Sequence, residues 1–170
     1  MDVYLLRHAV AEDRDAEKFP NDDDRPLTAE GVSKMKLAAD GIAELIEPPD
    51  VILTSPLPRT LHTAEIVARA LGCKDRVEAS DMLKPGAKVD AVRKELIVRG
   101  GQGVEGIMLV GHEPDMGAMA SAMIGAKGAT IEFKKGSLCA IRLDAEHFDR
   151  PGVLLWHVTP KQLRAIGKRR

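Results

Sequence analysis

The stretch Val3-Tyr4-Leu5-Leu6-Arg7-His8 joins a short apolar run directly to two reactive side chains. An apolar run of this length, bounded by polar residues, is typical of a strand buried on both faces of a sheet. Two similar runs follow, Val51-Ile52-Leu53 and Ile107-Met108-Leu109-Val110, and each also ends at polar residues. The three runs therefore predict the central, parallel strands of an α/β protein.

Helical patterns fill the intervals between these strands. Thr28 is expected to cap a helix with apolar residues at helical spacing from Val32 to Ile46, and Pro48-Pro49 is expected to end it. Further helices are expected over about 57–71 with Gly72 closing it, over 89–98 with Gly100-Gly101 ending it, over 114–124, and over 160–166. Strands that alternate with helices favour a sheet covered by helices on both faces.

The last part of the chain departs from this alternation. Segments 137–143 and 152–158 have the apolar composition of paired strands, joined by a polar turn over 144–151. They are expected to add an antiparallel hairpin to the parallel strands. We therefore predict a single domain over residues 1–170, folded as a three-layer α/β/α sandwich with a mixed, mostly parallel central sheet.

The composition limits the class of protein. With 170 residues, 44% apolar content and a formal net charge of −1, the chain can bury one substantial core and has no basic field for nucleic acid. No segment approaches the roughly 20 apolar residues that span a bilayer, and Arg7 and His8 interrupt the first apolar stretch too early for a signal peptide. Cys73 and Cys139 lack metal-ligand spacing and are expected to be free thiols in a reducing cytoplasm. The basic residues 168–170 are expected to form a solvated terminus.

Arginine and histidine side chains follow the three predicted parallel strands. Arg7 and His8 end the first strand, Arg59 lies just beyond the second, and His112 follows the third. The carboxyl ends of parallel strands meet at one edge of a sheet, where ligands bind. Guanidinium groups bind phosphate in bidentate fashion, a neutral imidazole can attack phosphorus, and a second, protonated imidazole can stabilise charge on the transferring oxygens. The four side chains therefore predict a phosphoryl-transfer site.

Other polar residues have simpler interpretations. Ser55 is expected to act in a turn rather than as a nucleophile, and Glu113 to cap the following helix. Glu78 and Asp81 are candidate acids near the site, although surface carboxylates are the simpler interpretation. The Asp22-Asp23-Asp24 run has no metal-binding pattern, so we expect a solvated loop and no metal site.

Four blocks of the sequence resemble the histidine phosphatase superfamily, which includes phosphoglycerate mutase-like enzymes. Leu6-Arg7-His8-Ala9 resembles its Arg-His-Gly signature, and residues 55–64 resemble its Ser-Pro-x-x-Arg-Ala-x-Gln-Thr-Ala block. Val110-Gly111-His112-Glu113-Pro114 resembles its Gly-His-Asn-Pro block, and Arg25-Pro26-Leu27-Thr28-x-x-Gly31 resembles a further one. The blocks occur in the family's order across nearly the whole chain, which makes the combined match specific.

The resemblance implies a role for each matching residue. His8 corresponds to the nucleophile, and Arg7, Arg59 and His112 correspond to the rest of the phosphate pocket. Arg25 corresponds to an arginine at the pocket mouth, where it either contacts the substrate or anchors the loop. The implied fold is that of the phosphoglycerate mutases.

The small size of the chain, together with 134–137 and Gly152-x-Leu154-x-Trp156, is most similar to the SixA-type phosphohistidine phosphatases. Mutase-like relatives carry a glutamate as general acid where this chain has Leu83-Lys84-Pro85, so Pro85 stands in the place of the acid. A phosphoester needs its leaving alkoxide protonated, whereas the imidazole of phosphohistidine departs more readily. Ala9 and His62 replace the family's usual Gly and Gln.

The resemblance thus implies a phosphohistidine phosphatase that works through a phospho-His8 intermediate, without metal or cofactor. The expected partner is a phosphohistidine-bearing protein such as a phosphotransfer domain or a phosphocarrier, and phosphate or sulfate is expected to fit the pocket. Neither nucleic acid nor a membrane is expected as partner, and a monomer is the favoured state. Two alternatives stay open: a small-molecule phosphoester phosphatase or mutase, and a non-catalytic phosphate- or phosphoprotein-binding module.

Overall fold

A computed structural model describes residues 1–126 and 128–168, so Arg169 and Arg170 of the basic tail lie outside the described residues. Within these residues the strands form one six-stranded sheet in the order β3-β2-β4-β1-β5-β6. The strands are β1 (Asp2–Arg7), β2 (Val51–Thr54), β3 (Val77–Ala79), β4 (Gly106–Gly111), β5 (Leu138–Arg142) and β6 (Val153–Val158). β1 to β4 pair in parallel and β5 and β6 are antiparallel, which confirms the predicted mixed, mostly parallel sheet.

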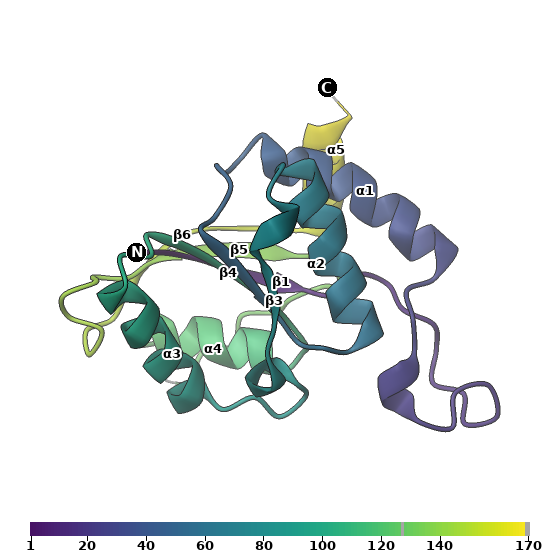
Figure 1. Ribbon diagram of the computed structural model, residues 1–170, viewed down its shortest axis with the longest axis horizontal. Coiled ribbons are helices and arrows are strands. Elements are labelled where there is room, and N and C mark those ends of the chain that lie inside the picture. The colour runs from purple at the N-terminus through teal and green to yellow at the C-terminus, as the bar shows by residue number, and fades with distance from the viewer. Residues whose placement is uncertain (127, 169–170) are drawn as a thin grey trace.

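Helices cover both faces of this sheet, as Figure 1 shows. One face carries α1 (Ala29–Ala43), α2 (Pro58–Ala70) and α5 (Pro160–Gly167), and the other carries α3 (Val89–Gly101) and α4 (Asp115–Met123). Short 3-10 turns lie at η1 (Asp22–Asp24), η2 (Lys74–Arg76) and η3 (Asp81–Leu83). The three-layer α/β/α sandwich predicted from the sequence is therefore confirmed.

The alternation of side chains along β1 explains why two cores form. Leu6 points into the cluster shared with α1, α2 and α5, whereas Val3 and Leu5 point into the cluster shared with α3 and α4. All three side chains are fully buried. A strand with both faces covered needs apolar residues at successive positions. This is why the apolar residues from Val3 to Leu6 form a continuous run and do not alternate with polar residues.

The helix boundaries follow local chemistry, with one correction. Thr28 caps α1 as predicted, since its Oγ1 accepts a hydrogen bond from the Gly31 amide at 2.9 Å. Gly72 follows α2 with φ of +73°, the left-handed geometry expected of a closing glycine. The next helix, α3, ends at Gly101, but it extends beyond the predicted Val98 and includes Gly100 and Gly101 as its last residues, and Gly103 beyond it takes the left-handed conformation.

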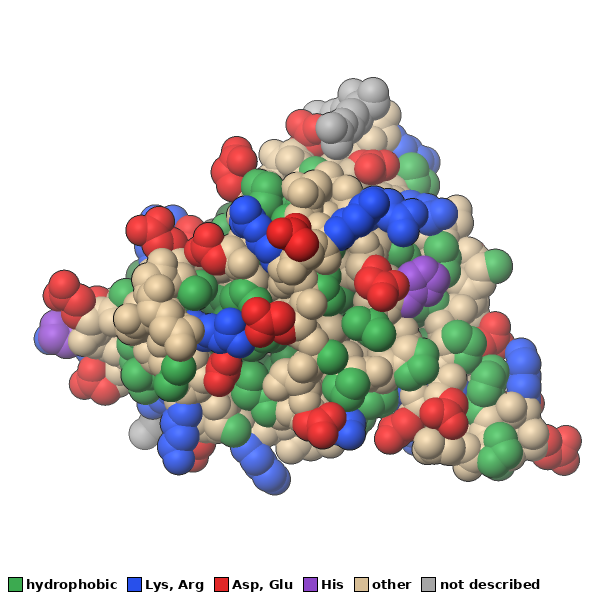
Figure 2. Space-filling model, viewed as in Figure 1, with side chains coloured by type: hydrophobic (Ala, Val, Ile, Leu, Met, Phe, Trp, Pro, Cys, Tyr) green, Lys and Arg blue, Asp and Glu red, His purple; other side chains and the backbone are tan. Residues whose placement is uncertain are grey.

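Cys73 and Cys139 are buried free thiols. No helix in the described part of the chain is both long and apolar enough to cross a bilayer. On the face drawn in Figure 2, acidic and basic side chains are interspersed rather than gathered by sign, in keeping with a net charge near zero.

Candidate active site

Neighbouring strands bring the predicted site residues together. β1 and β4 pair in parallel up to Arg7 and Gly111, so His8 and His112 leave the sheet side by side, with ring centroids 5.3 Å apart. Arg59 reaches the same place from the first turn of α2. Arg7, His8, Arg59 and His112 all line one pocket of about 390 Å³, large enough to receive a small anion.

The ring of His8 is held in one orientation by its own neighbour. Its Nδ1 lies 2.7 Å from the carbonyl oxygen of Ala9. A carbonyl can only accept, so Nδ1 carries the proton, and the neutral ring then has its lone pair on Nε2. Burial, above all, lowers the pKa of His8 to about 3, and the charges of His112, Arg59 and Arg7 act in the same direction. His8 is therefore a neutral imidazole near pH 7.

His112 is held by a hydroxyl rather than a carbonyl. Its Nε2 lies 3.0 Å from Oγ of the fully buried Ser55. Burial lowers the pKa of His112 to about 4, and the charges of Arg59, Arg7 and Arg25 add to the effect. The sequence suggested a protonated second imidazole, but in this pocket His112 is neutral near pH 7, because burial above all, and then three nearby cations, lower the pKa of the ring. A bound anion would favour the protonated ring.

A loop distant in sequence fixes Arg7. Nη1 of Arg7 donates to the carbonyl oxygen of Phe133 at 2.5 Å. The backbone amide of Arg7 donates to the carbonyl oxygen of Ser137 at 3.2 Å. The Gly136 amide donates to the carbonyl oxygens of Arg7 and His8, both at 3.1 Å. Nε of Arg7 is buried without a hydrogen-bond partner among the described residues. The sequence marked residues 134–137 as similar to the SixA-type enzymes, but it did not predict that this loop holds Arg7, because the contacts are made by backbone groups.

Arg59 is almost fully buried and is fixed from two sides. Its Nη1 donates to the carbonyl oxygens of Asp22 at 3.1 Å and Asp23 at 3.4 Å. Its own carbonyl accepts from Oγ1 of Thr63 at 2.6 Å, and the same Oγ1 accepts from the Ala9 amide at 3.1 Å. Thr63 therefore ties the helix that carries Arg59 to the residue that orients His8.

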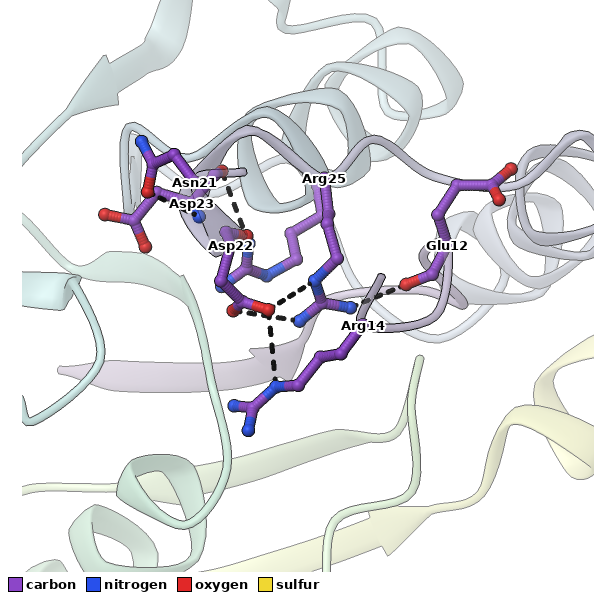
Figure 3. Close-up of polar contacts among 7 residues, drawn as sticks. Glu12, Arg14, Asn21, Asp22, Asp23 and Arg25 are labelled. Atoms are coloured by element: carbon purple, nitrogen blue, oxygen red, sulfur yellow. Dashed lines mark hydrogen bonds and ion pairs between the residues drawn. The ribbon is translucent and has the colours of Figure 1, made fainter. Parts of the chain in front are cut away.

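Arg25 lines the pocket, but each of its nitrogens is engaged by the loop (Figure 3). Nε and Nη2 donate to the Asp22 carboxylate at 2.8 and 3.1 Å, and Nη1 donates to the carbonyl oxygen of Glu12 at 2.6 Å. Arg14 adds an ion pair to Asp22 at 3.3 Å. The contacts seen are those of a loop anchor, and Asp22 itself was not predicted.

The sequence analysis named three carboxylates near the site, Glu78 and Asp81 as candidate acids and Glu113 as a helix cap. Pro85 lines the pocket, whereas Glu78 pairs with Arg99 at 2.6 Å and Asp81 with Lys84 at 2.9 Å, outside it. Glu113 lines the pocket while accepting from the amides of Gly117 at 3.2 Å and Phe133 at 3.3 Å, which agrees with the predicted capping role.

Some rim residues escaped the sequence analysis. Asp13, Asp23 and Lys135 line the pocket; the sequence analysis noted Asp23 only as part of a solvated acidic run and Lys135 only within the 134–137 stretch, and placed none of the three at the site. His62 lies on α2 in a groove against α1, away from this pocket. Within residues 1–126 and 128–168, no three His, Cys, Asp or Glu side chains are grouped so as to hold a metal ion.

The fold and the pocket define a class of protein: an α/β sandwich with paired histidines and arginines placed for an oxyanion at the carboxyl ends of its strands. The family model described as the histidine phosphatase superfamily (branch 1) matches residues 3–84. This chain belongs to the histidine phosphatase superfamily.

Similar proteins extend the match beyond the residues that the family model covers. An uncharacterized protein of Picosynechococcus sp. (strain PCC 7002) is 36% identical over 147 residues, which cover 85% of this chain and 87% of the relative. Phosphohistidine phosphatase SixA of Escherichia coli (strain K12) is 24% identical over 164 residues, covering 96% and 97%. The structure of protein histidine phosphatase SixA complexed with tungstate matches with a TM-score of 0.83 and 26% identity, covering 96% of this chain and 99% of that one.

Proposed function

We propose that this protein is a phosphohistidine phosphatase that removes a phosphoryl group from a histidine of another protein through a phospho-His8 intermediate. The single observation that carries the proposal is the hydrogen bond from Nδ1 of His8 to the Ala9 carbonyl, 2.7 Å long, within a pocket lined by Arg7 and Arg59. It leaves a lone pair on Nε2 in a cationic pocket, which is what an attack on a phosphoryl group requires.

The reaction follows from this geometry in two steps. Nε2 of His8 forms a bond to phosphorus while the P–N bond of a ring-protonated phosphohistidine breaks, and the substrate imidazole keeps the electron pair and leaves as a neutral ring. Water then attacks phosphorus, the bond to Nε2 breaks, both protons of the water leave with the product as dihydrogen phosphate, and His8 is neutral again with its proton on Nδ1. Arg7, Arg59 and His112 stabilise charge on the three phosphoryl oxygens during both transfers.

Two observations support a phosphohistidine substrate. Pro85 lines the pocket where mutase-like relatives are expected to carry an acid, and an imidazole leaving group has little need of one. The SixA relatives match nearly the full length of the chain, and the SixA structure with tungstate holds an oxyanion. A small phosphoester is the rival substrate, favoured by the exposed side chains of Asp13 and Asp23 at the pocket rim, since either could act as the general acid when its carboxyl group is protonated.

The test is to trap the intermediate. The protein is mixed with a ³²P-labelled phosphohistidine peptide and quenched within milliseconds, and acid-labile, base-stable label on the protein is measured. We expect label on the wild type and on His62→Ala, a matched histidine outside the pocket, and none on His8→Ala. Label that persists in His8→Ala would reject His8 as nucleophile. Binding of phosphate without turnover of any phosphodonor would support a non-catalytic module instead.

Turnover rates then separate the two substrate classes. The value of kcat/KM is compared for a phosphohistidine peptide and for a panel of sugar phosphates and phosphoamino acids. We expect the peptide to be the better substrate by orders of magnitude. An ester that turns over faster than the peptide would replace the proposed substrate with the rival one.

A further inference from the structure

The carboxylate of Asp22 joins two arginines at the mouth of the active-site pocket. Its Oδ1 lies 2.8 Å from Nε of Arg25 and 3.3 Å from Nε of Arg14, and its Oδ2 lies 3.1 Å from Nη2 of Arg25 (Figure 3). All three residues line the pocket. A single negative charge is therefore shared between two positive charges that would otherwise face an incoming anion.

The two arginines are held to different degrees. The side chain of Arg25 is only 11% exposed and meets Asp22 through two nitrogens, the fork geometry that makes arginine–carboxylate pairs strong. The side chain of Arg14 is 83% exposed and meets Asp22 through Nε alone. Without the carboxylate, both guanidinium groups would regain donors for a ligand.

Asp22 is also tied to the floor of the pocket. Its backbone carbonyl accepts a hydrogen bond from Nη1 of Arg59 at 3.1 Å, so the residue that neutralises the mouth is positioned by a residue of the phosphate site. This link fixes the distance between the phosphoryl site and the Asp22 cluster, meaning Asp22, Arg25 and Arg14. Because the cluster lines the same pocket as the phosphoryl site, a second anionic group on a small phosphoester would face it, whereas a phosphohistidine presents only its phosphoryl group and an imidazole.

We propose that Asp22 is a specificity-determining residue: by binding Nε and Nη2 of Arg25 and offsetting part of the charge of the exposed Arg14, it weakens the attraction for the second anionic group of small phosphoesters and so favours a substrate that carries a phosphoryl group alone. Arg7 and Arg59 stay available for that phosphoryl group. The inference rests on the proposed function, since it explains how the pocket would select phosphohistidine over carboxylate-bearing esters. Asp22 contacts no reacting atom in this role.

The test compares two ligands that differ in one carboxylate. Dissociation constants of phosphoglycolate and ethyl phosphate are measured by calorimetry at fixed ionic strength. The wild type is expected to discriminate weakly between them. Asp22→Asn is expected to favour phosphoglycolate about tenfold more than the wild type does, the effect of one regained charged hydrogen bond. Asp22→Glu, which keeps the charge, should restore the wild-type ratio.

Matched variants separate specificity from a general disturbance of the loop. Asp24→Asn removes the same charge from the same 3-10 turn at a position that does not line the pocket, and should leave the ratio unchanged. Asp22→Ser gives a second neutral variant if Asn perturbs folding. A loop that merely loosens would change the affinity for both ligands equally, so an unchanged ratio in both neutral variants would overturn the proposal. Because both ligands are phosphomonoesters, each titration is repeated in the His8→Ala background, where the proposed nucleophile is absent, and the ratio obtained there is independent of whether the phosphohistidine peptide is hydrolysed.

Discussion

The hydroxyl of Ser55 lies 3.0 Å from Nε2 of His112, and this contact sets which nitrogen of the ring remains for a ligand. Ser55 is fully buried, and its Oγ also receives the Leu57 amide at 3.4 Å, so the hydroxyl is itself fixed in place. With Nε2 engaged, Nδ1 is the nitrogen of His112 that an anion in the pocket can meet. Ser55 is thus both the turn residue that the sequence predicted and a positioning residue for His112.

Removing this hydroxyl should therefore impair catalysis more than folding. If His112 acts as proposed, Ser55→Ala is expected to lower kcat about tenfold, the effect of losing one hydrogen bond that orients its ring, with a smaller change in KM. The control is Ser121→Ala, which deletes a buried hydroxyl that has no partner among the described residues. Equal kcat values for the two variants would contradict the positioning role.

Two buried threonines on α2 offer a second comparison. Oγ1 of Thr63 accepts from the Ala9 amide, whereas Oγ1 of Thr60 donates to the carbonyl oxygens of Ser55 and Leu57. Thr63→Val strands a buried amide donor, but Thr60→Val leaves carbonyls that keep other donors, since the Ser55 carbonyl also receives the Thr54 hydroxyl and the Leu57 carbonyl receives a backbone amide.

We therefore expect Thr63→Val to lower the free energy of unfolding by about 1–3 kcal/mol and Thr60→Val by less, measured by urea denaturation. Thr63→Val should also lower kcat, because Thr63 connects Ala9 to the backbone of Arg59. If Thr60→Val proves the more destabilising of the two, the amide of Ala9 has another acceptor and the argument fails.

The sequence predicted the sheet well because its central strands are buried on both faces. Continuous apolar runs such as Val3 to Leu6 have few other stable environments in a chain of mixed composition. The end of α3 was harder to predict to the residue, because glycines are tolerated in a helix at a cost of about 1 kcal/mol each, so Gly100 and Gly101 form its last residues and the left-handed glycine is Gly103.

Within the site, the residues at strand ends could be predicted from the sequence, whereas the groups that hold them in place could not. Arg7, His8 and His112 stand directly at strand ends, so the topology alone brings them together. The groups that hold them were not predictable: Phe133, whose carbonyl binds Arg7, is 126 positions away in the chain and acts through its backbone. Asp22 lay in an acidic run of ordinary appearance, and only the folded loop places it against two arginines.

Stability should depend on pH through the two pocket histidines. Their folded-state pKa values of about 3 for His8 and about 4 for His112 lie below the unfolded value of about 6.5, so the unfolded chain binds more protons between these limits. The stability that the two neutral histidines contribute is therefore fully present above about pH 6.5. It is lost as the pH falls toward their folded-state pKa values. The two together should give a slope of up to about 2.7 kcal/mol per pH unit near pH 5.5.

Urea denaturation at closely spaced pH values between 5 and 7 measures this slope. His112→Gln should reduce the slope by up to about 1.4 kcal/mol per pH unit, because one of the two titrations is removed. His147→Gln, at an exposed position in the turn before β6, should leave the slope unchanged. If His112→Gln leaves the slope of the unfolding free energy against pH unchanged, the pKa of His112 is the same in the folded and unfolded chain and the prediction is wrong.

The affinity of the pocket for an anion should also depend on pH, through protonation of His112. Sulfate stays a dianion across this range, and its charge in the pocket should raise the pKa of His112 above the value of about 4 that burial and the cations Arg59, Arg7 and Arg25 impose on the empty site. Binding then takes up a proton at any pH between the free and bound values, so affinity falls as the pH rises through that window, by at most about tenfold per pH unit for one proton. Calorimetry in two buffers of different ionisation enthalpy measures the proton uptake directly. We expect His112→Gln to bind sulfate more weakly and without this uptake; uptake that survives the substitution would assign the titrating group to His8.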